Sequence, residues 1–226
     1  MKYTLAILVA MAVACSAHRA LAKPLKVDAK RLVRVLGSID ARIVPQANKV
    51  LDLAQKSKKP IYLLVNSPGG SVMAGGVFIA AVELAKARGV KVKCVTSVMA
   101  ASMAFSILTH CSERYILPSA HLLFHPVWTQ AKYINARSAA QMATELDRID
   151  SDLLNWLEQQ MGMERDLLES AFYAEKWWTA KELKGATRSG WVTIVTDVTG
   201  VKGLFDYKPS SSPFQKGYKI FNEATK

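Results

Sequence analysis

The sequence predicts an α/β domain built on a largely parallel sheet. Three observations predict this class: short β-rich apolar runs recur along the chain, segments with apolar residues at helical spacing separate them, and half of the 226 residues are hydrophobic. Strands that alternate with helices favour parallel pairing, because each helix carries the chain back across the sheet. A chain of this length can bury one substantial core, so a single domain is expected.

The expected elements follow in chain order. The strand at 31–37 alternates apolar and basic residues, and the segment 38–56 then has helical spacing, with Pro45 tolerated because it falls in the first turn. The β-rich run 60–65 leads through two adjacent glycines into a helix at 73–89. Further elements are expected as strands at 90–98, 114–118 and 121–126, a short helix at 101–111 and a long amphipathic helix at 136–161.

The two ends of the chain differ from its middle. The first 22 residues combine a basic second residue, an apolar run and an A-x-A pattern ending at Ala22, which is typical of a cleaved secretory signal. Retention of the run as a membrane anchor, or lipidation at Cys15, are the alternatives, and a cytoplasmic protein is another. The expected organisation is a signal peptide at 1–22, a domain at 23–200 and a basic, weakly ordered or draped tail at 201–226, in an exported protein that is periplasmic or otherwise extracytoplasmic.

Charge and metal-ligand patterns exclude two classes of site. The net charge is +12, and removing residues 1–22 takes away Lys2 and Arg19 but no acidic residue, which leaves +10. The basic residues are scattered without an aromatic-interleaved motif, so no nucleic-acid site is indicated. The cysteines and histidines show neither CxxC nor HExxH spacing. We expect no metal and no cofactor.

Adjacent glycines, Gly69 and Gly70, stand where the apolar run 60–65 meets the following helix. The stretch lacks the lysine of a phosphate-binding GxxxxGK[ST] loop and does not match GxGxxG. Two interpretations stay open from the residues alone: the glycines supply positive φ angles for a tight turn, or something must come close to their backbone.

Ser102 is the first candidate for chemistry. In "TSVMAASMAFSIL" a strand ends, small residues permit a sharp turn, and Ser102 begins a helix, where free backbone N–H groups converge. Nucleophiles of acyl transfer are presented in this way, although serine is also a common helix cap. Both interpretations remain open on this stretch alone.

A serine nucleophile needs a base, and histidine is the usual one. The candidates are His110, His121 and His125. His110 lies at the far end of the helix that Ser102 begins, and His121 and His125 lie about 13 Å apart on one strand, so only one of those two can reach the serine. His125 precedes Pro126 at the end of the strand, where the active-site groups of parallel sheets gather.

Three motifs, "VNSPGGSVMAGG", "SVMAASMAF" and "HLLFHP", in this order and spacing, resemble the ClpP-type serine peptidases of the ClpP/crotonase superfamily. The resemblance extends from about residue 31 to residue 197. It implies a ClpP/crotonase-like spiral of ββα units with a long helical handle. It also implies four roles: Ser102 as nucleophile, His125 as general base, and the backbone N–H groups of Gly70 and Met103 as an oxyanion hole.

The acid of the triad departs from the family pattern. Where the family has an aspartate, this chain has Glu175 in "AEKWWTAKEL", and Glu182 and Asp197 are the reserves. Glutamate is one methylene longer, so its backbone must lie farther from the imidazole. A second departure is bulky Trp128 and Tyr133, where the family has a glycine-rich strand that pairs with substrate.

The function that the resemblance implies is a serine endopeptidase that cleaves peptides or unfolded chains through an acyl-enzyme, in a homo-oligomeric ring with contacts along the helix 136–161. The short segment 23–30 does not match the family's axial gating segment, so we expect no dedicated ATPase, and a Clp-type ATPase partner only if the chain is cytoplasmic. The alternatives are a catalytically impaired oligomeric module of the same fold, a crotonase-like acyl-CoA hydrolase, or a signal-peptide-peptidase-like enzyme with a lysine base.

Cys94 and Cys111 are expected at similar depths, one on the strand before Ser102 and the other at the end of the helix after it. An oxidising compartment would favour a disulfide between them, closing a loop with Ser102 near its middle. The alternative is two buried, reduced thiols.

Overall fold

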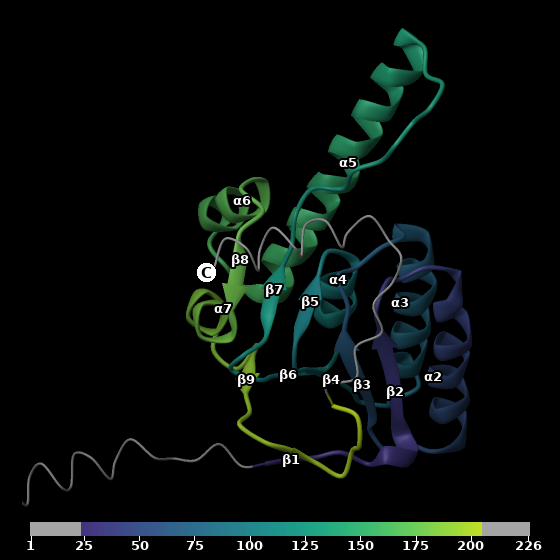
Figure 1. The fold of residues 1–226 in the computed structure, drawn as a ribbon, viewed down its shortest axis with the longest axis vertical. Coiled ribbons are helices and arrows are strands. Elements are labelled where there is room, and N and C mark those ends of the chain that lie inside the picture. Colours follow the sequence, from purple (N-terminus) through teal and green to yellow (C-terminus); the bar gives the residue numbers. More distant parts are fainter. Residues whose placement is uncertain (1–23, 205–226) are drawn as a thin grey trace, which may run out of the picture.

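The structure, a computed structural model, describes residues 24–204 (Figure 1). The signal peptide expected at 1–22 and the tail from residue 205 onward lie outside the described residues.

The domain is built on a five-stranded sheet in which all described neighbours pair in parallel. This confirms the α/β class and the parallel pairing. The strands stand in the spatial order β2 (Leu32–Leu36), β3 (Ile61–Asn66), β4 (Val92–Thr96), β6 (Glu113–Ile116) and β9 (Thr193–Ile194).

The two faces of this sheet are covered differently. In β3, Leu63 and Val65 face the main core, whereas Leu64 belongs to a smaller cluster on the opposite face, as the two-residue period of a strand requires. The helices α2 (Val44–Lys56) and α3 (Val72–Ala87) pack against the first face (Figure 1). On the second face, the smaller cluster includes residues in and beside the short parallel pair of β1 (Leu25–Lys26) and β10 (Val198–Thr199). Burial on both faces explains why 60–65 is a continuous apolar run.

A second, three-stranded sheet carries the elements that matter for the site. In it β5 (Met99–Ala101) pairs in parallel with β7 (His121–Leu123), which pairs antiparallel with β8 (Trp177–Thr179). The sequence did not predict β5 or β8, because each has only three residues. The strand expected at 121–126 ends at Leu123. The helix α4 (Met103–Thr109) begins two residues after β5 ends.

Asn66 joins the two sheets. Its fully buried amide accepts from the N–H groups of Ser97 (3.0 Å) and Val98 (2.9 Å), and donates to the Ser97 hydroxyl (2.8 Å). The amide also donates to the carbonyl of Leu204 at 3.1 Å. The first residues of the expected tail are therefore held against the ends of the central strands, and the side chain of the last residue of β3 fixes the bend between β4 and β5.

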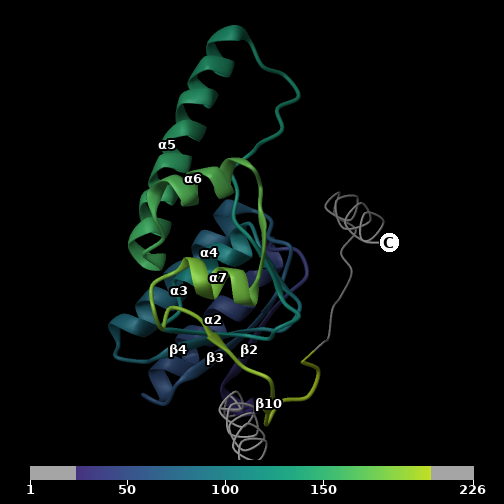
Figure 2. The same cartoon turned by 90° about the vertical axis from the view of Figure 1, so that its left-hand side faces the viewer.

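The long helix α5 (Ala136–Met161) has the bounds that its apolar period predicted. It projects from the domain in both views (Figures 1 and 2), and the segment between β7 and α5 runs alongside it. The buried side chains of α5 all lie in its second half: Asp150, Leu154, Leu157 and Met161. Its first half is therefore the protruding handle that the resemblance implies.

Two short helices, α6 (Arg165–Tyr173) and α7 (Ala180–Ala186), follow α5. Thr179 and Glu182 form a reciprocal capping box at the start of α7. Among the helices between residues 24 and 204, none combines the length and the apolar character needed to cross a membrane.

Candidate active site

Ser102 occupies a strained turn between β5 and α4. Its φ of 54° and ψ of −129° lie in a region that side-chain-bearing residues rarely adopt. Its N–H donates to the carbonyl of Leu123 on β7 (2.9 Å), and its carbonyl accepts from Phe105 and Ser106 in α4. The Ser102 hydroxyl does not cap α4, so the helix-cap interpretation does not account for this serine. Strain of this kind is concentrated at functional sites.

Gly69 faces the nucleophile turn directly. Its φ is +95°, and a Cβ atom added to it would lie 2.6 Å from Ser102 Cβ and 2.7 Å from the carbonyl oxygen of Ala101. Gly70, with a φ of +147°, faces the other way, and its added Cβ would lie 2.2 Å from the carbonyl oxygen of Ile39. Both interpretations of the glycines are therefore correct. The turn needs positive φ at both positions, and other parts of the chain come close to Gly69 on one side and to Gly70 on the other.

The two N–H groups expected to form an oxyanion hole lie at this junction. Gly70 and Met103 both line the cavity that contains Ser102. Met103 is the first residue of α4, where backbone N–H groups have no partner within the helix. Among residues 24–204, neither N–H donates a hydrogen bond. These two groups are therefore available to a bound carbonyl oxygen.

His125 lies in the same cavity and is 8% exposed. The parallel register pairs Ala101 with Leu123, so Ser102 and His125 leave the same end of neighbouring strands. The Nδ1 atom of His125 lies 2.7 Å from the carbonyl oxygen of Pro126. A carbonyl can only accept, so Nδ1 carries the proton, and in the neutral imidazole it is Nε2 that has the free lone pair. This is the tautomer that a general base needs.

Within the described chain, no hydrogen bond joins the Ser102 hydroxyl to His125. Catalytic hydrogen bonds are often long without substrate and tighten only in the complex. The structure therefore places the two side chains in one cavity without joining them.

The structure does not bring Glu175 to the imidazole. Glu175 is exposed in the turn after α6, has a φ of 50°, and neither lines the cavity nor bonds to His125 in the described residues. Of the reserves, Glu182 belongs to the capping box, where the backbone N–H of Thr179 lowers the pKa of its carboxyl. Asp197 is exposed beside β10 and does not line the cavity.

A carboxylate that the sequence analysis did not single out contacts the segment that follows His125. Asp150 on α5 is 8% exposed, and its Oδ1 accepts from the N–H of Val127 at 2.7 Å. The signal that could have revealed it is its place between Leu146 and Leu154, at the helical spacing where a buried apolar residue is expected.

The cavity has a volume of about 900 Å³. Beyond the four proposed catalytic positions, its walls include the apolar side chains of Ile79, Phe124, Leu153, Trp156 and Leu157. Ionisable side chains at its walls are Asp40, Arg42, His110 and Asp152. It can hold an apolar side chain beside Ser102.

The other two histidines take different places. The ring of His110 stacks on Trp156, with centroids 4.3 Å apart, and its Nδ1 lies 2.9 Å from Glu83 Oε1. Burial lowers the pKa of the His110 imidazole, and Glu83 opposes this effect. His121, on β7, is absent from the cavity walls. Of the three candidate bases, His125 therefore has the position that suits Ser102 best.

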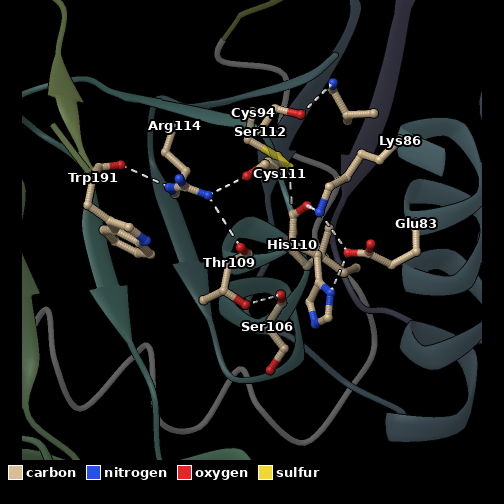
Figure 3. The surroundings of a disulfide bond; sticks show 12 residues. Glu83, Lys86, Cys94, Ser106, Thr109, His110, Cys111, Ser112, Arg114 and Trp191 are labelled. Carbon is tan, nitrogen blue, oxygen red and sulfur yellow. Dashed lines mark hydrogen bonds and ion pairs between the residues drawn. A yellow bond between two sulfur atoms is a disulfide. The ribbon is translucent and has the colours of Figure 1, made fainter. Parts of the chain in front are cut away.

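A disulfide joins Cys94 on β4 to Cys111 just after α4, with the Cα atoms 5.9 Å apart (Figure 3). Of the two alternatives for these cysteines, the structure has the bonded one. Beside it, the Arg114 guanidinium donates to the carbonyls of Thr109, Cys111 and Trp191, as Figure 3 shows. Burial, aided by nearby Arg188, lowers the pKa of Arg114 to about 10. The end of α4 that lies away from Ser102 is therefore held both by the disulfide and by the hydrogen bonds from Arg114.

Comparison with known proteins gives a family. The family model described as Clp protease matches residues 19–198. The ATP-dependent Clp protease proteolytic subunits of Streptococcus pneumoniae strains Hungary19A-6, CGSP14 and ATCC BAA-255 / R6 are each 30% identical to this chain over 132 residues. The match covers 57% of this chain and 66% of each relative, which is just under two thirds of their length.

Substitution by alanine should change the free energy of unfolding in opposite directions at Gly69 and Gly76. Gly69→Ala forces a side chain into the Ser102 turn at positive φ, so we expect the free energy of unfolding to fall by about 2 kcal/mol or more. Gly76→Ala, in the exposed face of α3 with nothing near its added Cβ, should raise it by about 0.5 to 1 kcal/mol. Urea unfolding of both variants measures this. Equal effects would contradict the packing described around Gly69.

The disulfide should leave Cys15 as the one titratable thiol in the denatured, unreduced chain of 226 residues. Three free thiols would rule the bond out. Reduction should lower the free energy of unfolding by about 3 kcal/mol, because a loop of this size gains chain entropy when it is opened in the unfolded state. The double variant Cys94→Ala, Cys111→Ala should be insensitive to reductant in the same measurement.

Proposed function

Because the chain belongs to the Clp protease family, we propose that it is a serine endopeptidase that cleaves peptides or unfolded chains through an acyl-enzyme at Ser102. The observation that carries the proposal is the strained turn at Ser102, which holds a hydroxyl unused for capping in the same cavity as His125. Membership of the Clp protease family supports a peptidase reaction, and the turn supports the choice of Ser102 as its nucleophile.

The proposed reaction uses four groups. His125 Nε2 takes the proton of the Ser102 hydroxyl as Oγ attacks the substrate carbonyl carbon. The N–H groups of Gly70 and Met103 donate to the oxygen that becomes negative, an effect worth about 3 to 4 kcal/mol per donor in known cases. The protonated imidazole then gives its proton to the leaving amine as the C–N bond breaks. Water, deprotonated by His125, then attacks the acyl carbon, and the imidazolium returns this proton to Ser102 Oγ as the ester bond breaks.

We further propose a homo-oligomeric ring. The curated relatives are named as subunits of an ATP-dependent protease. Here α5 projects from the domain, and α3 presents Met73, Val77 and Leu84 on an exposed apolar face. Trp156, in the second half of α5, packs on His110 of its own chain. The contact surface is therefore proposed for the first half of α5 and for the apolar face of α3.

Export and independence from a dedicated ATPase form one proposal. The leader pattern at 1–22 supports export, and the disulfide between Cys94 and Cys111 suits an oxidising compartment. An exported protein would meet no cytoplasmic unfoldase, so its substrates would be peptides or chains that are already unfolded. A Clp-type ATPase partner belongs to the alternative, in which the chain stays in the cytoplasm.

A second candidate function is a catalytically impaired module of the same fold. The placement of Glu175 favours it, because the position that the resemblance assigns to the triad acid does not reach His125. Covalent labelling of Ser102 by a fluorophosphonate separates the two candidates, because only an active serine enzyme would be labelled.

Incubation of the purified protein with a fluorophosphonate should give a covalent adduct at Ser102, identified by peptide mapping. The reagent reacts only with a serine activated by a nearby base, so Ser102→Ala and His125→Ala should both abolish labelling. Ser170→Ala, an exposed serine on α6, should label like the wild type. An adduct at Ser97 or Ser106, or none, contradicts the peptidase proposal. Labelling that survives His125→Ala would favour the enzyme with a lysine base.

Light scattering should give a particle several times heavier than the 24.8 kDa chain. Leu84→Glu, on the exposed apolar face of α3, should reduce the particle mass, because a buried charge without a partner is costly at a contact between copies. Lys49→Glu, an exposed change on α2, is the control and should leave the mass unchanged. A wild-type protein of monomer mass would end the ring proposal.

A further inference from the structure

We propose that Asp150 is the carboxylate that positions His125, and that it acts through the peptide group between Pro126 and Val127. This inference rests on the proposed function, in which His125 is the general base for Ser102. It assigns a role to a buried acid on α5 that the resemblance does not supply.

Two hydrogen bonds meet on one peptide group. His125 Nδ1 donates to the carbonyl oxygen of Pro126, and the N–H of Val127 donates to Asp150 Oδ1, both over 2.7 Å. The Pro126 carbonyl and the Val127 N–H belong to the same planar unit, whose C–N bond has partial double-bond character. Hydrogen bonds in such a chain polarise one another. The carboxylate therefore strengthens the acceptor that holds the imidazole in its required tautomer.

The burial of Asp150 makes its charge available to this chain of bonds. A carboxylate is seldom buried without a partner, and Asp150 is 8% exposed. No ion pair joins it to a cation in the described part of the chain. The nearest arginine in sequence, Arg148, instead pairs with Glu145 and Asp152 on the exposed side of α5. The negative charge of Asp150 is thus left to favour the imidazolium that forms when His125 takes the serine proton.

The helix α5, which carries Asp150, is also better suited to positioning His125 than the turn that carries Glu175. Asp150 lies in the buried half of α5, between Leu146 and Leu154. Glu175 lies in an exposed turn with a φ of 50° and makes no bond to His125 among residues 24–204. An acid fixed by core packing holds the backbone of residues 126 and 127 in one place, and through it the imidazole ring.

A purely structural role for Asp150 would use the same bond to Val127, so the test must separate positioning from folding. Steady-state hydrolysis of a fluorogenic peptide by the full-length protein gives kcat and KM separately. Asp150→Asn keeps the shape and an oxygen acceptor for Val127 but removes the charge, whereas Asp150→Ala removes both. Asp147→Asn, one turn earlier and exposed on the same helix, is the matched control.

We expect Asp150→Ala to lower kcat about 100-fold with KM little changed, because a displaced catalytic group costs factors of this order. Asp150→Asn should lower kcat about tenfold, with a wild-type unfolding midpoint in urea, because the acceptor remains and the charge is lost. Asp147→Asn should match the wild type. If Asp150→Ala does not fold, the Asp150→Asn variant alone decides.

The inference is overturned, and the proposed function stands, if fluorophosphonate labels Ser102 and Asp150→Asn retains the wild-type kcat. It is equally overturned if Glu175→Gln lowers kcat more than Asp150→Asn does. If the wild-type protein neither labels nor hydrolyses peptides, the proposed function and the inference fail together.

Discussion

The close approach of Gly69 to the turn that holds Ser102 is the constraint on which the site depends. It brings the turn after β3 against the turn after β5, so two loops that are more than 30 residues apart in sequence meet with no room for a side chain between them. The contact places the N–H groups of Gly70 and Met103 on one cavity wall. Ser102, beside this contact, has a φ of 54°, a strain of about 1 to 3 kcal/mol that the surrounding structure must offset.

That offset comes from both ends of α4. At its start, the N–H of Ser102 is held by Leu123 of the neighbouring strand. At its end, the disulfide ties Cys111 to β4, and Arg114 satisfies the carbonyls of Thr109 and Cys111. These contacts oppose any unwinding of α4 that would release the strain at its start. The proposed role of Ser102 as a nucleophile would require firm support of this kind, because small displacements of reacting groups are costly in rate.

Local patterns predicted most of the fold, and the parts that failed depend on distant contacts. The period of α5 gave its bounds, and the glycine pair and the Ser102 turn followed from short motifs, since their conformations are set by neighbouring residues. The three-residue strands β5 and β8 carry too few side chains to show a period. The approach of Asp150 to Val127 could not be predicted, because it depends on how segments far apart in sequence pack together.

The energetics of Asp150 argue that its charge has a use beyond anchoring a loop. Removing a carboxylate from water costs several kcal/mol, and a single hydrogen bond to it returns about 1.5 to 3 kcal/mol. An asparagine at the same place would accept from Val127 without that desolvation cost, so a role in folding alone would favour the amide. The charged form has an advantage only if a positive charge forms nearby, and in the proposed reaction His125 gains one when it takes the proton of Ser102. In that reaction, the cost of burying the acid in the resting protein would be offset in the transition state, where stabilisation raises the rate.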